Sequence, residues 1–106
     1  MSLKIYPVAL QLLCEVRPAL ERIEKRDRNL HNQMLRASES MVLNLAEGSY
    51  SQGGNKRVRY FNSLGSTREV LSCVEVAMAL GYIEPLAPAV LHRFNHVIGT
   101  LVRLVK

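Results

Sequence analysis

The sequence predicts an all-α fold in which residues 1–106 form a single four-helix-bundle domain. Only 6 Gly and 4 Pro interrupt the 106 residues, which is too little turn chemistry for a β-sandwich or a β-barrel. Apolar residues make up 48% of the chain, and they recur at steps of three and four residues in four successive segments. We therefore expect an antiparallel up-down bundle of four helices.

The first helix is expected over about residues 4–27. Pro7 suits its first turn, and Pro18 falls on the side away from the apolar stripe, so the helix is expected to bend toward solvent and continue. The stripe that should face the core consists of Ile5, Val8, Ala9, Leu12, Val16, Ala19, Leu20 and Ile23.

The second helix is expected over about residues 30–48. Gly48 is the residue type that commonly ends a helix, and the stretch 49–55, with Gly53 and Gly54, is predicted to be a loop. The face expected to be buried consists of Met34, Ala37, Ser38, Met41, Val42, Leu45 and Ala46.

The third helix, expected over about residues 56–81, is apolar on two sides. One side carries Leu64, Leu71, Val74 and Met78. The other carries Val76 with a line of small residues, Gly65, Ser72 and Ala79, which predicts a close helix contact. An isolated bundle of this size covers only one such face, so the pattern predicts that copies of the chain associate into a homo-oligomer.

The fourth helix is expected over about residues 85–105, opened by Pro85 and Pro88. Its apolar stripe consists of Val90, Leu91, Phe94, Val97, Ile98, Leu101, Val102 and Val105. Its other face carries no acidic residue and consists of His92, Arg93, Asn95, His96, Thr100, Arg103 and Lys106.

The charge of the chain suggests a polyanionic partner. The net charge is +5, and residues 51–106 hold seven basic and three acidic residues. Such a surface would bind RNA or DNA through phosphates, with little base specificity because no aromatic platform is expected beside the cations. The alternative is that these charges only keep a structural or protein-binding oligomer in solution. The candidate nucleic-acid contacts are Lys56, Arg57, Arg59, Arg68, Arg93, Arg103 and Lys106.

No catalytic motif is present in the sequence. The GxSxG, P-loop, GxGxxG and paired-carboxylate patterns are absent, so we expect no catalytic residue and no cofactor. His92 and His96 stand one turn apart, which leaves a metal-dependent enzyme as a weaker third reading. They lack the HExxH pattern and a nearby Cys or carboxylate, so no metal is expected.

The two cysteines and the apolar runs indicate a cytoplasmic protein. Cys14 and Cys73 both fall among apolar neighbours, which predicts reduced, buried thiols. The longest apolar runs, such as 8–10 and 76–80, are far shorter than a membrane span, and the first residues do not have the pattern of a secretory signal. No membrane partner is expected.

One line of polar residues on the second helix, Arg36, Ser40, Asn44 and Glu47, lies on one side of that helix. From the residues alone it could bind a ligand, form a buried polar network or face water. The surrounding string Leu35–Gly48, followed by Gly65–Glu69 and by Leu80–Ile83, resembles a bacterial family of four-helix-bundle proteins encoded in intervening sequences of 23S ribosomal RNA genes. A relative of that family is the accessory variability determinant of diversity-generating retroelements.

The family pattern is R-x-x-x-S-x-x-x-N-I-A-E-G, then G-S-x-x-E, then a Leu-Gly pair. The chain departs from it at Leu45, at Asn62-Ser63, and after Gly48, where the family commonly has an Arg. The positions that match are Arg36, Ser40, Asn44, Ala46, Glu47, Gly48, Gly65, Ser66, Glu69 and Gly81.

The resemblance implies a homopentameric ring. For the retroelement relatives it also implies a basic surface that binds RNA or DNA and a reverse transcriptase. It further implies a structural polar network between helices or subunits, formed by Arg36, Ser40, Asn44, Glu47 and Glu69.

Overall fold

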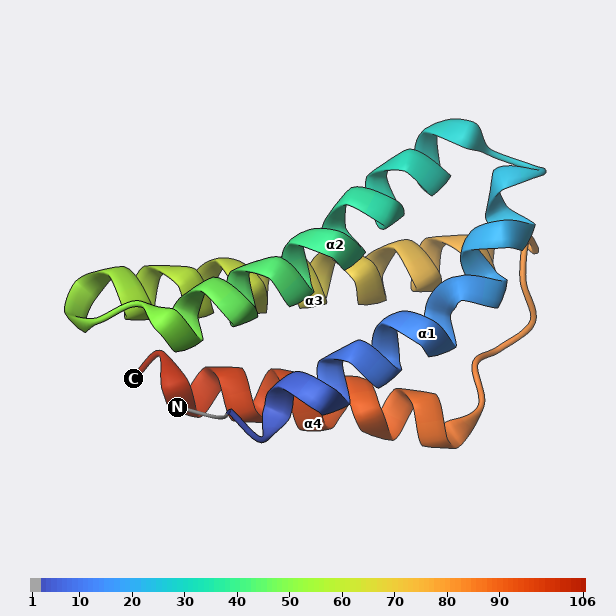
Figure 1. The fold of residues 1–106 in the computed structure, drawn as a ribbon. Coiled ribbons are helices and arrows are strands. Elements are labelled where there is room, and N and C mark those ends of the chain that lie inside the picture. The colour runs from blue at the N-terminus through green and yellow to red at the C-terminus, as the bar shows by residue number, and fades with distance from the viewer. Residues whose placement is uncertain (1–2) are drawn as a thin grey trace.

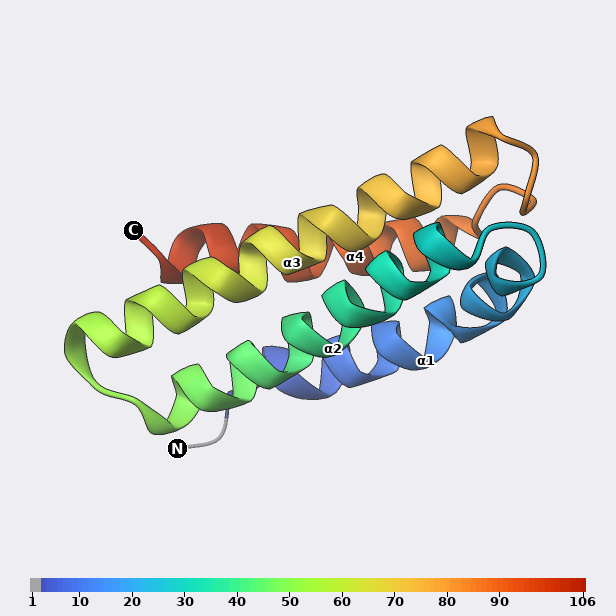
Figure 2. The same ribbon diagram turned by 90° about the horizontal axis from the view of Figure 1, so that it is seen from above.

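The computed structural model describes residues 3–106, and within that range it contains four helices and no strand. The helices are α1 (Ile5–Glu24), α2 (Arg28–Tyr50), α3 (Gly53–Ala79) and α4 (Pro88–Leu104). Each of α1 and α3 packs against both α2 and α4, and the most extensive contact is between α2 and α3. The result is an elongated bundle of 42 × 26 × 20 Å (Figures 1 and 2). The predicted all-α, four-helix fold is confirmed.

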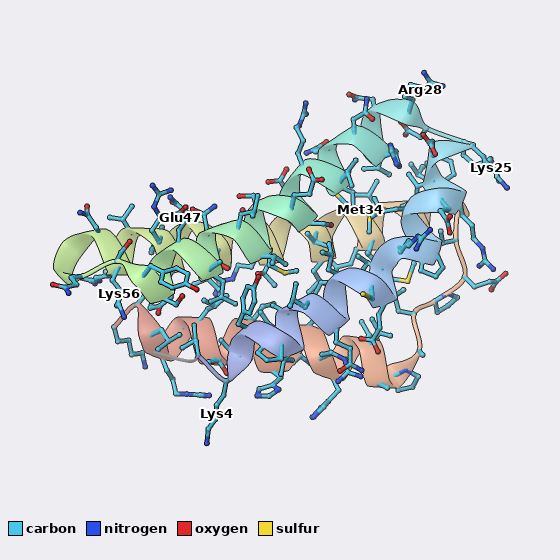
Figure 3. The ribbon with its side chains drawn as sticks, in the orientation of Figure 1. Lys4, Lys25, Arg28, Met34, Glu47 and Lys56 are labelled. Carbon is cyan, nitrogen blue, oxygen red and sulfur yellow. The ribbon has the colours of Figure 1, made fainter. Side chains whose placement is uncertain are left out.

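Each helix contributes one apolar stripe to a common core, as the periodicity predicts. The first stripe is buried as expected except for Val8, which is half-buried. Met34, labelled in Figure 3, lies fully buried among the helices. The largest fully buried side chains come from all four helices and include Phe94, Leu12, Ile23, Met41, Leu45, Leu101 and Val74.

The turn between α1 and α2 differs from the prediction. Pro18 lies within α1 and is exposed, as predicted, but α1 ends at Glu24 instead of residue 27. Asp27 is the N-cap of α2, because its carboxylate accepts a hydrogen bond of 3.0 Å from the Leu30 N–H. The same carboxylate accepts one of 3.3 Å from the Tyr82 hydroxyl, which joins this turn to the segment that follows α3.

The prediction that the second helix stops at Gly48 is wrong. Gly48 is buried inside α2, which continues to Tyr50. The Tyr60 ring of α3 occupies the space that a Cβ on Gly48 would need. Because Gly48 has no side chain, α2 and α3 can approach each other closely there. This glycine does not mark the end of a helix.

The loop predicted over residues 49–55 is also wrong. Only Ser51 and Gln52 separate the two helices, and α3 begins at Gly53, where the φ of 59° explains the glycine.

The end of α3 is close to its predicted position. Gly81 has a φ of 75°, and its N–H donates to the Met78 carbonyl while the Tyr82 N–H donates to the Ala77 carbonyl. These two bonds form a Schellman motif, so the helix ends at Ala79.

The fourth helix begins three residues later than predicted. It starts at Pro88, and Ala87 before it is extended, as residues that precede a proline prefer to be. Pro85 therefore lies in the connecting segment and not in the helix.

The contact between Gly48 and Tyr60 leads to a stability prediction. Gly48→Ala should lower the free energy of unfolding by about 1–3 kcal/mol, because the buried ring must move to admit the methyl group. Urea unfolding followed by circular dichroism measures the change. Gly65→Ala is the matched control. Nothing lies within 4 Å of its Cβ, so it should gain about 0.5–1 kcal/mol from helix propensity. Equal stability of the two variants would contradict the packing argument.

Candidate functional site

The outer face of α3 carries large apolar side chains that the bundle leaves exposed. Its apolar members include Phe61, which is 63% exposed, Leu80 at 55% and Val76 at 45%. The small residues Gly65, Ser72 and Ala79 lie on the same face and are exposed. The predicted close contact along this line is therefore not made within one chain. The prediction that α3 has a second apolar face is correct.

A shallow groove that contains several polar side chains lies between α2 and α3 beside this face. The Asn44 side-chain amide donates to the Ser40 hydroxyl at 2.9 Å, and the Ser66 hydroxyl donates to the same oxygen at 2.8 Å. Arg59 donates from Nη1 to the Asn44 side-chain oxygen at 3.4 Å. The bonds of Ser66 and Arg59 join α3 to α2, whereas the bond of Asn44 to Ser40 lies within α2. The groove is lined by Ser40, Asn44, Phe61, Asn62, Gly65, Ser66 and Glu69.

The structure brings together only part of the predicted polar network. Ser40 and Asn44 hydrogen-bond to each other, whereas Glu69 accepts a bond of 3.4 Å from Gln33. Arg36 and Glu47 are exposed, and neither side chain forms a hydrogen bond or ion pair with another residue in the range 3–106.

Three members of this polar cluster were not predicted for the network. Gln33 was not predicted for any site, Arg59 was predicted as a nucleic-acid contact, and Ser66 was named only as a motif position. The G-S-x-x-E motif contained the signal for one of them, since Ser66 lies one turn before Glu69 and so faces the same side of α3.

Basic residues gather where α3 begins and α4 ends. The Arg57 Nε donates to the Val105 carbonyl at 2.7 Å, and the Lys56 Nζ lies 5.8 Å from the centre of the Tyr60 ring. Figure 3 shows Lys56 at this end of the bundle. Lys106 follows Val105 directly, and Arg103 extends back along α4 to donate to the Thr100 hydroxyl at 3.3 Å.

Two further arginines lie along α3 on either side of Phe61. Arg59 and Arg68 are both exposed, and Arg68 forms no hydrogen bond or ion pair with any residue that the structure describes. The expectation that no aromatic side chain accompanies the cations is wrong, because the exposed Phe61 ring lies among them. The sequence analysis included Phe61 in neither of the two apolar faces predicted for the third helix.

Arg93 differs from the other basic residues of the predicted surface. Its Nε and Nη2 donate to the two Glu15 carboxylate oxygens at 2.5 and 3.0 Å. These hydrogen bonds raise the pKa of Arg93 above its ordinary value. The basic face of α4 is therefore interrupted by an acidic residue, which comes from α1 and not from α4.

The remaining titratable groups form no metal site within the described range. His92 and His96 are exposed on α4, and residues 3–106 contain no group of three or more His, Cys, Asp or Glu side chains that could hold a metal ion. Within the same range, none of the helices combines the length and the apolar character needed to cross a bilayer.

The two thiols have different environments, so the prediction that both are buried is half wrong. Cys14 lies on the exposed side of α1, and Cys73 lies in the core. Burial, together with the negative charge of Glu69, raises the pKa of the Cys73 thiol.

The family model for the 23S rRNA-intervening sequence protein matches residues 1–101. The chain belongs to this family. The resemblance based on the motifs of α2 and α3 is thus confirmed. No curated protein and no solved structure matches the chain.

Within this member of the family, most of the motif residues fall into two groups. Ser40, Asn44 and Ser66 connect α2 to α3, and Gly48 admits the Tyr60 ring. The charged motif residues lie at the surface. The matched motifs therefore describe the α2–α3 contact and the surface beside it.

The thiols give a prediction that is independent of function. In the native protein one of two thiols should react with Ellman's reagent, because Cys14 is exposed whereas burial and a raised pKa protect Cys73. Cys14→Ser should abolish the native reaction, and both thiols of the wild type should react in denaturant. Rapid reaction of two thiols in the native protein would contradict this burial.

Proposed function

We propose that this 23S rRNA-intervening sequence protein is a non-enzymatic, cytoplasmic oligomer that binds nucleic acid through a repeated basic surface. The observation that carries the proposal is the set of exposed arginines on α3, none of which forms an ion pair with a carboxylate of residues 3–106. Such cations are available to phosphates.

The proposed assembly starts from an antiparallel up-down bundle. Its support is the order of contacts between α2 and α3, because Gln33, Ser40 and Asn44 meet residues of decreasing number, Glu69, Ser66 and Arg59. Five such bundles would form a closed ring, the pentamer that the family resemblance implies.

The contact between copies would use the C-terminal half of the outer face of α3, defined by Ser72, Val76, Ala79 and Leu80. These side chains are small or apolar, all are exposed, and no Lys or Arg lies between them along α3. A second backbone can approach closely there, and the exposed apolar area gives a reason for it to do so.

The N-terminal half of α3 would then remain available to nucleic acid in every copy. Arg57 and Arg59 lie there, Arg68 lies just past the middle of the helix, Lys106 lies beyond the end of α4, and Glu69 is the nearest acidic residue of α3. A ring repeats these charges, so their fields add at its surface. Arg93 would contribute little, because Glu15 already neutralises it.

The second candidate is a structural or protein-binding oligomer without affinity for nucleic acid. It is favoured by the hydrogen bonds of Arg93 to Glu15 and of Arg59 to Asn44, because two of the predicted nucleic-acid contacts already have partners within the chain. The reverse transcriptase that the retroelement relatives imply would be such a protein partner.

Nucleic-acid binding is tested with labelled RNA and DNA in fluorescence anisotropy titrations between roughly 50 and 200 mM salt. The wild type should bind at low salt and weaken steeply as salt rises. The double variant Arg59→Gln with Arg68→Gln should reduce the slope of log affinity against log salt by about 1–2, because two phosphate contacts are lost. The control Arg93→Gln should leave the slope unchanged. Absence of binding at low salt overturns the proposal in favour of the second candidate.

The assembly is tested by sedimentation velocity. The wild type should sediment with five times the mass of one chain, and Val76→Asp should produce monomers, because it places a charge in the apolar contact. Leu43→Asp is the control, since Leu43 is as exposed as Phe61 but lies on α2. A monomeric wild type refutes the ring, and a monomer formed only by the control variant places the contact elsewhere.

A further inference from the structure

A single phenylalanine ring projects from the N-terminal half of α3 between arginines. Phe61 is 63% exposed. Arg57 precedes it by one turn and Arg68 follows it by two turns, so the three side chains leave the same face of the helix. Gly65 occupies the intervening turn, and nothing lies within 4 Å of its Cβ position. One side of the ring is therefore left open by the chain itself.

The ring lies beside an arginine that has a partner within the chain. Arg57, Val58 and Phe61 line a shallow, mostly apolar hollow. The Nε of Arg57 is fixed on the Val105 carbonyl at 2.7 Å, and its two terminal nitrogens have no acceptor among the described residues. A planar apolar surface thus lies directly beside a held guanidinium.

The charges around the hollow indicate which kind of ligand would bind there. Arg57 lines the hollow and Arg68 carries a second positive charge on the same face, whereas Arg59 bonds to Asn44 of α2. The nearest carboxylate on α3, that of Glu69, lines the groove on the other side of Phe61 and accepts a hydrogen bond from Gln33. The same face of a second copy would bring like charges together. A ligand that combines negative charge with flat apolar rings matches both features, and nucleic acid has this composition.

We propose that Phe61 is a stacking platform for an unpaired base, so that the nucleic acid bound here is single-stranded. This inference rests on the proposed function. The arginines neutralise the phosphates on either side of the base that lies on the ring. In a duplex the bases stack on each other and present no open face to Phe61.

The absence of Trp from the chain makes the test direct. Phe61→Trp introduces one indole, whose fluorescence should be quenched when a base stacks on it. The full-length variant is titrated with oligo-uridine and oligo-thymidine of roughly 12 nucleotides and with a duplex of equal length. Quenching is expected with the single strands and not with the duplex.

A second measurement compares the binding affinities of variants that carry no indole. Phe61→Leu keeps the apolar character but removes the ring, and it should weaken binding of the single strands about 5- to 100-fold while binding of the duplex changes little. Phe61→Tyr should restore binding. The control Leu43→Ala removes an equally exposed apolar side chain on α2 and should bind like the wild type.

The outcomes separate this inference from the function on which it rests. If the wild type binds no nucleic acid at low salt, both are wrong. If it binds but Phe61→Leu retains its affinity for single strands and the indole is not quenched, only the stacking platform is overturned. If Phe61→Leu changes the sedimentation of the protein, the ring belongs to a contact between copies and the inference is likewise overturned.

Discussion

A helix in a four-helix bundle buries one face, and α3 carries apolar side chains on two. The inner face supplies Tyr60, Val70 and Val74 to the core. The outer face leaves Phe61, Val76 and their neighbours in water, where they raise the free energy of the isolated chain. The surfaces of functional interest on this protein follow from that surplus, and α2 adds the exposed side chains of Leu43 and Tyr50 to it.

The register between α2 and α3 determines which polar and charged side chains lie beside the exposed apolar face of α3. Gly48 lets the Tyr60 ring lie against the backbone of α2, and Ser40 receives the hydroxyl of Ser66. Together these contacts fix the two helices relative to each other, which brings Arg59 within reach of Asn44. The motif that links the chain to its family is thus first a packing device, and the charged surface is positioned by it.

The basic residues have three different environments in the folded chain. Arg93 is paired with Glu15, and Arg57 donates to a carbonyl at the C-terminal end of α4, where helices leave acceptors unsatisfied. Arg68 has neither kind of partner among the described residues. The number of basic residues therefore overstates how many cations lack a partner within the fold.

The sequence by itself determined the helical class, the four stripes and the α2–α3 motif, because a period of 3.6 residues and local caps are properties of short segments. The sequence also determined the end of α3, because Gly81 supplies the positive φ that terminates the helix. The N-cap Asp27 had a local signal too, but the alternating charges around it obscured the boundary.

Only the tertiary structure decided what depends on residues far apart in the chain. Gly48 looks like a helix end until the Tyr60 ring is placed against it, and Arg93 looks free until Glu15 arrives from α1. The exposure of Phe61 and of Cys14 is likewise set by which neighbours pack nearby. Such contacts form between residues that no periodicity relates, so they are properties of the assembled bundle.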